Sequence, residues 1–334
     1  MKGCVDRVVR GVLLLGALAG CSSAPPKQAS SPDPSLEEPP NAPPVAAASS
    51  AKVQQGLDAI QQQNFAAAKS VLVQARSEAP KDPQAAFYLG VAHEGLEEFK
   101  AAEQQYRDAL ELDPALSDAS ANLSALLLDA ANGKEALSVI EQGLKTSPKH
   151  PELLVNRALA LETAGDIEGA VKAYAVAVGV RPQDPELRLA YADLLIQSGQ
   201  ADRALEQVRA GSETDDPKLM AAVAHRFGKL KAPAECVAVL DRAIKAKPVA
   251  ELYARRGVCR HDAGDDAGAQ ADYEAALKLE PDSAPAHFYL GKHLMAKDKK
   301  AAAQHLSKVV ELTGGKGLGA AAKAALADLG KNKK

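Results

Sequence analysis

From about residue 50 onward, apolar and polar positions alternate with the period of a helix, in pairs of short segments. The clearest pair spans residues 82–114. Pro83 opens the first segment, because proline fits only the first turn of a helix, and Pro114 ends the second. The apolar face of the first segment begins at Phe87-Tyr88-Leu89-Gly90, and that of the second is Phe99, Ala102, Tyr106 and Ala109. This pattern predicts two amphipathic helices joined by a turn near Gly95.

The same pair recurs along the chain at a fixed distance. Intervals of 34 residues separate Pro80, Pro114, Pro148 and Pro182, and also Ala68, Ala102, Ala136, Ala170 and Ala204. A period of about 34 with small residues at the helix crossing is typical of stacked helix-turn-helix repeats. Because aromatic residues make up only 4% of the chain, we expect no sheet and an all-α fold.

These columns resemble the tetratricopeptide repeat (TPR) family over roughly residues 49–315. The matching residues of one repeat are Leu89, Gly90, Ala102, Tyr106, Ala109 and Pro114, and the leading Trp of the family is absent. The resemblance implies a right-handed solenoid of about eight repeats over residues 51–316. A capping helix and a basic tail are then expected over residues 317–334, because an open stack needs a solubilising end. It also implies a scaffold without enzymatic activity.

In this family the first helix of each repeat lines a concave groove. Transferred to the matching positions, the resemblance implies a peptide-binding groove lined by Leu57, Phe87, Val91, Asn122, Val155, Asn156, Leu159 and Leu189. Apolar side chains together with amides suit the binding of a protein segment. Part of this set must serve ordinary helix packing, and we expect the remainder, Phe87 and Leu159 among them, to face solvent until a protein partner arrives. We expect neither a cofactor nor a small-molecule substrate.

The first residues predict an export signal and a lipid anchor. Lys2, Arg7 and Arg10 form a positive start, and the stretch from Val8 to Ala19 is mainly apolar, which is the plan of a signal peptide over residues 1–20. The ending Leu18-Ala19-Gly20-Cys21 resembles the bacterial lipobox, which implies lipidation at Cys21. Residues 21–50 are rich in proline and predict a disordered tether. With serines after Cys21, the resemblance implies the outer membrane and its periplasmic face.

Charge and candidate chemistry narrow the function further. The net charge of −3 gives no field that would attract nucleic acid. Among the seven histidines, His287, His293 and His305 come nearest to a cluster, yet no two lie three or four residues apart, so we expect no metal site. Cys236 and Cys259 are expected in neighbouring antiparallel helices, either as a disulfide or as two buried thiols. The distance of about 8–10 Å between packed helix axes favours the thiols.

The basic end also leaves two interpretations open. From residue 292 onward there are ten lysines and three acidic residues, which favours a solvated cap or, alternatively, contact with an acidic partner or anionic lipid headgroups.

Together these features predict a non-enzymatic outer-membrane lipoprotein that holds other envelope proteins. Its overall plan resembles TPR lipoproteins that assist the assembly of type IV pilus secretins. The alternative is a regulatory subunit of a cell-wall synthesis enzyme complex.

Overall fold

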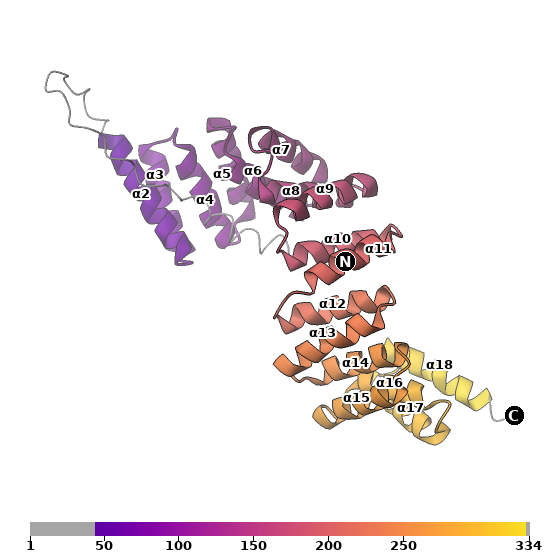
Figure 1. Ribbon diagram of the computed structural model, residues 1–334. Coiled ribbons are helices and arrows are strands. Elements are labelled where there is room, and N and C mark those ends of the chain that lie inside the picture. The colour runs from indigo at the N-terminus through magenta and orange to yellow at the C-terminus, as the bar shows by residue number, and fades with distance from the viewer. Residues whose placement is uncertain (1–43, 332–334) are drawn as a thin grey trace, which may run out of the picture. The chain divides into compact units, whose positions relative to one another are not determined.

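The computed structural model describes residues 44–331, with side chains from 51 to 330. The predicted signal peptide, Cys21 and most of the predicted tether lie outside the described residues. Every regular element within 44–331 is an α-helix, which confirms the predicted all-α repeat fold (Figure 1). None of these helices combines the length and the apolar character that crossing a membrane requires.

The chain divides into two compact units at Pro182. The first unit contains four helix pairs, each with a first and a second helix. They are α2 (Pro44–Gln61) with α3 (Phe65–Glu78), α4 (Pro83–Gly95) with α5 (Phe99–Leu112), α6 (Ser117–Asp129) with α7 (Gly133–Thr146), and α8 (Pro151–Thr163) with α9 (Ile167–Val180).

The second unit contains four further pairs and one final helix. They are α10 (Pro185–Gln197) with α11 (Ala201–Gly211), α12 (Pro217–Lys229) with α13 (Pro233–Ala246), α14 (Ala250–Asp262) with α15 (Asp266–Leu279), α16 (Ala284–Leu294) with α17 (Lys299–Thr313), and α18 (Leu318–Lys331). Buried Ala322, Ala325 and Leu329 of α18 pack with Leu306 and Val309 of α17, so α18 covers an apolar face of the last pair.

Helix starts follow the predicted period because the same local signals recur. Asp82 caps α4 by accepting hydrogen bonds from the backbone N–H groups of Gln84 and Ala85, and Pro83 occupies the first turn. Asp184 with Pro185 and Asp216 with Pro217 start α10 and α12 in the same way.

The turn inside each pair of the first unit uses one residue in the left-handed region. In the first unit these residues are Gln63, Glu97, Ala131 and Gly165, with φ between 58° and 80°, and each follows the last by one repeat. The predicted turn near Gly95 is thus centred on Glu97, and Gly95 is the last residue of α4. Only Gly165 of the four adopts this conformation without steric cost.

The alanine and tyrosine columns form the crossing between the two helices of a pair. Ala102, Tyr106 and Ala109 of α5 are fully buried. A Cβ atom on Gly90 of α4 would lie 2.6 Å from the Tyr106 ring, so this position admits only glycine beside the aromatic ring. The Gly-to-Tyr spacing in the sequence is therefore a packing requirement.

One predicted boundary differs from the structure. Helix α2 begins at Pro44, within the segment predicted to be a disordered tether. Proline at the first helical position supplies a start signal, and the three alanines that follow Val45 are strong helix formers.

Candidate interaction surface

The residues predicted to line the groove are mostly buried. Phe87, Val91, Leu57, Val155 and Leu159 are at most 8% exposed in the first unit, where α2 packs on α4 and α6 packs on α8. The expectation that Phe87 and Leu159 face solvent is wrong, because each first helix buries its apolar side chains against neighbouring helices. Leu189 belongs to the second unit, where it is 3% exposed and packs with Val208 and Met220.

The two predicted asparagines differ in their surroundings. The Asn156 amide is 1% exposed and donates to the carbonyl oxygen of Ala121 at 2.9 Å and to the Ser124 hydroxyl at 3.0 Å. These bonds tie α8 to α6. Asn122 is half-buried, and its amide donates to the hydroxyl of Tyr106 at 3.2 Å. Of the eight predicted residues, only Asn122 is partly open to solvent.

Asn122 belongs to a polar network that sequence reasoning missed. The Tyr106 hydroxyl donates to a carboxylate oxygen of Glu94 at 2.7 Å, so α4, α5 and α6 meet at this tyrosine. Burial raises the pKa of Glu94 to about 7, partly opposed by the Tyr106 hydrogen bond and reinforced by the Asp129 charge. Burial also raises the pKa of Tyr106. Glu94 is therefore partly protonated at neutral pH.

The same bond recurs two repeats later. The Tyr174 hydroxyl of α9 donates to Glu162 of α8 at 2.7 Å. The spacing of 12 residues from Glu94 to Tyr106 and from Glu162 to Tyr174 is the sequence signal that would have revealed it. We call Glu94, Asn122 and Glu162 the polar strip; all three side chains are partly exposed on first helices of the first unit.

Exposed apolar side chains of the first unit lie on the second helices instead. Phe99 opens α5 and is 49% exposed, in contrast to 3% for Phe87 of the same pair. The others are Val73 on α3, Leu112 on α5, and Val176 and Val180 on α9. Because they are dispersed over three helices, they carry no assigned role.

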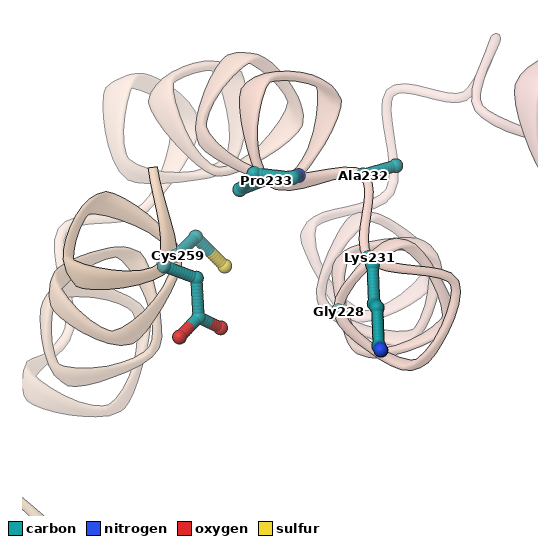
Figure 2. A pocket seen from close by; sticks show the side chains of 6 residues that line it. Gly228, Lys231, Ala232, Pro233 and Cys259 are labelled. Atoms are coloured by element: carbon teal, nitrogen blue, oxygen red, sulfur yellow. The ribbon is translucent and has the colours of Figure 1, made fainter. Parts of the chain in front are cut away.

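In the second unit, Cys236 of α13 and Cys259 of α14 form a disulfide with Cα atoms 6.0 Å apart. The preference for two thiols is thus wrong: the neighbouring antiparallel helices bring the two Cα atoms within bonding reach. Beside it lies a pocket of about 450 Å³, lined by Gly228, Lys231, Ala232, Pro233, Cys259 and Asp262 (Figure 2).

The histidines of the last repeats are less scattered than the sequence indicated. His287 of α16 and His305 of α17 approach with their Nδ1 atoms 2.8 Å apart. His261 and His293 lie in different helices and approach a shared carboxylate, Asp266. This triad is the group in the described part of the chain that could hold a metal ion. Local spacing of three or four residues does not detect it, because its members come from three helices.

Comparison with known proteins agrees with this architecture. Family models of the tetratricopeptide repeat match residues 48–213 and 262–316. No curated protein matches the chain significantly. The solved structure of PilF from Pseudomonas aeruginosa is similar with a TM-score of 0.54 at 18% identity, covering 62% of this chain and 95% of that chain.

A tetratricopeptide repeat protein from Parabacteroides merdae is similar with a TM-score of 0.50 at 18% identity, covering 74% of this chain and 99% of that chain. Likeness at this identity concerns the fold. The family models extend over both units of the chain. The chain therefore belongs to the tetratricopeptide repeat family, whose repeats are scaffolds for protein–protein interaction.

Proposed function

We propose that this protein is a non-enzymatic scaffold, anchored by lipid to the periplasmic face of an outer membrane, that holds another envelope protein. Its task is to assist the assembly of an envelope complex such as a pilus secretin. The observation that carries the proposal is the sequence Leu18-Ala19-Gly20-Cys21 at the end of an apolar run, placed before a chain of interaction repeats.

The anchor follows from the chemistry of such a cysteine. A chain held by two or three acyl groups stays on a bilayer, because each buried CH₂ contributes about 0.8 kcal/mol and one acyl chain alone is marginal. Proline-rich sequence then separates Cys21 from α2. That separation leaves room for a partner between the repeats and the lipid.

The partner is a protein segment that contacts the polar strip. The apolar residues of the first helices are buried between helices, whereas Glu94, Asn122 and Glu162 keep part of their polar surface in solvent. Tyr106 bonds Glu94 and Asn122, and Tyr174 bonds Glu162, so all three side chains are held in fixed positions, which lowers the entropy lost on binding. Amide and carboxylate groups so held suit hydrogen bonding to a peptide backbone.

The anchor is tested with Cys21→Ala. We expect loss of radioactive palmitate incorporation and release of the protein from the membrane fraction. Cys4→Ala is the matched control, because it removes a cysteine of the same leader outside the lipobox. Continued lipid labelling of the Cys21→Ala protein would refute the anchor.

The partner surface is tested by crosslinking on intact membranes. Asn122→Ala removes a half-exposed amide, and Asn132→Ala removes an exposed amide in a turn that bonds only to Glu135 in its own repeat. One hydrogen bond is worth about 0.5–1.5 kcal/mol, so we expect partner recovery to fall about two- to tenfold in Asn122→Ala alone. Equal recovery in both variants would contradict the assignment of the polar strip.

The process is tested in a deletion strain. Loss of secretin multimers on gels, restored by the wild-type gene, supports the assembly role. Normal multimers with altered peptidoglycan crosslinking would instead identify the protein as a regulatory subunit of cell-wall synthesis.

A further inference from the structure

Three side chains of the second unit converge from three helices. His261 lies in the last turn of α14, Asp266 is the first residue of α15, and His293 lies near the end of α16. The Nδ1 atom of His261 is 2.9 Å from Oδ1 of Asp266, and Nδ1 of His293 is 3.9 Å from the same oxygen. One ligand atom from each residue lies within 4.8 Å of the other two.

His293 is held in this group with an unsatisfied atom. Its side chain is only 3% exposed, and its buried Nδ1 has no hydrogen-bond partner. An unpaired buried polar atom costs about 1–3 kcal/mol, so such an atom in a native protein calls for an explanation, and a role in binding a cation is one. The atom is directed toward the Asp266 carboxylate, where a cation would satisfy both groups.

The distances suit a transition metal. Zn²⁺ binds imidazole nitrogen at about 2.0–2.1 Å and carboxylate oxygen at about 2.0–2.2 Å, which places tetrahedral ligand atoms roughly 3.3 Å apart. The Asp266 Oδ1 atom lies 2.9 Å from Nδ1 of His261 and 3.9 Å from Nδ1 of His293, one distance below this value and one above it. Small side-chain rotations of the exposed His261 and Asp266 would therefore close the site, while His293 stays fixed.

The surroundings of His293 also favour coordination. Its ring packs edge-on against the buried Tyr273, with centroids 6.2 Å apart, and against the His261 ring at 5.8 Å. Tyr273 belongs to an apolar cluster with Ala269 and Leu290. A low-dielectric wall on one side strengthens the attraction between a cation and the Asp266 carboxylate.

The ammonium group of Lys297 lies at the edge of this group. The Lys297 ammonium donates to Nε2 of His293 at 3.0 Å and lies 3.4 Å from Oδ2 of Asp266. Because Nε2 accepts this bond, the ring proton sits on Nδ1. Coordination through Nδ1 moves that proton to Nε2 and expels the ammonium. The Lys297 side chain is 48% exposed, so it can turn into solvent.

We propose that His261, Asp266 and His293 bind one divalent transition-metal cation of the imidazole-binding class, with Zn²⁺ as the probe, and that the cation displaces Lys297. Two imidazoles and one carboxylate are the donor set of known three-ligand zinc sites and leave a fourth position open. The bound ion would join α14, α15 and α16 and thereby link two successive repeats.

The test is calorimetric titration of the full chain in detergent with Zn²⁺, after removal of metals by chelation. Non-reducing conditions keep Cys236 and Cys259 in their disulfide, because free thiolates would bind Zn²⁺ themselves. We expect one ion per chain, and Zn²⁺ should raise the melting temperature. In His261→Ala and His293→Ala the affinity should fall by at least about tenfold, as even outer-shell changes cost about 10–100-fold.

Matched variants decide whether the ion sits at this group. His225→Ala removes an exposed histidine of the same unit, and His287→Ala breaks the His287–His305 pair; both should bind Zn²⁺ as the wild type does. Lys297→Met should bind more tightly, because no ammonium competes. His261→Ala keeps the fold intact because the side chain is exposed, as melting without metal will verify.

Unchanged affinity in His261→Ala, or a loss confined to His287→Ala, would overturn the proposed site. Unchanged affinity in Lys297→Met would overturn the displacement of the ammonium.

Discussion

Replacing Phe87 by serine separates a packing role from a binding role. Phe87 is 3% exposed, and its ring lies 5.1 Å from that of Tyr88 and 5.9 Å from that of Tyr106. Truncating such a buried aromatic residue costs about 3–5 kcal/mol. At about 2–4 °C for each kcal/mol in a domain of 150–250 residues, the melting temperature should fall by about 6–20 °C.

The matched control is Phe99→Ser in the same repeat. Phe99 is 49% exposed, so its truncation should change the free energy of unfolding by less than about 1 kcal/mol. Thermal unfolding followed by circular dichroism at 222 nm measures both variants beside the wild type. If Phe87→Ser melts with the wild type and yet fails to recover the crosslinked partner, Phe87 is a groove residue and the packing argument is refuted.

Three further predictions concern pH, backbone and disulfide. The pKa of Glu94 is raised from its ordinary value of 4.5 to about 7 in the folded chain. The protonated carboxyl therefore contributes stability at low pH, and this contribution is lost as pH rises from about 4.5 through 7. Glu94→Gln should raise the melting temperature at pH 8 and not at pH 4.5, as thermal unfolding at the two pH values will show. Gly165→Ala should lower the free energy of unfolding by about 1–2 kcal/mol because φ is +80°, whereas Gly179→Ala in a helix with open space around it should raise it by about 0.5–1 kcal/mol, both measured by urea unfolding. Cys236→Ala with Cys259→Ala should cost about 3 kcal/mol from the 23-residue separation, and dithiothreitol should destabilise the wild type but not the double variant.

The sequence predicted helix positions well because the signals are local and repeat. Asp-Pro at a helix start and Gly90 opposite Tyr106 each act within one repeat, so the period alone places them. The exposure of Phe87 and Leu159 was not predictable in the same way. A repeat period shows which residues are equivalent, but their exposure depends on how closely the neighbouring first helices pack, and here they pack closely enough to bury both.

The polar contacts were missed for a related reason. Glu94 at the end of α4 bonds Tyr106 of α5 beyond the turn, and His261 of α14 contacts His293 of α16. Neither pair falls at the spacing of three or four residues that a single helix would give. Residues one repeat apart become neighbours when helices stack, so a search at spacings of about 12 and 32–34 would have found both groups.

Where the second unit departs from the repeat pattern, additional bonds join neighbouring helices. Lys231 takes the left-handed turn that Gly165 fills more easily, and Cys236 replaces an alanine of the crossing column. At the same place, the disulfide joins α13 to α14. A bidentate ion pair then joins Arg256 of α14 to Asp272 of α15, whose carboxylate is 4% exposed.

The His261 group continues this series from α14 and α15 to α16. Each of these bonds links neighbouring helices of the second unit. Together they offset the stability lost where Lys231 takes the left-handed turn conformation that suits glycine. A covalent bond responds to reductant and an ion pair to salt, whereas the proposed cation site responds to metal. If these connections act on the same stack of helices, chelator should lower the melting temperature of the zinc-loaded protein with Cys236→Ala and Cys259→Ala, in which no thiolate can bind Zn²⁺. Reductant should lower the melting temperature of the His261→Ala protein. In the zinc-loaded wild type, the two reagents together should lower it further than either one alone.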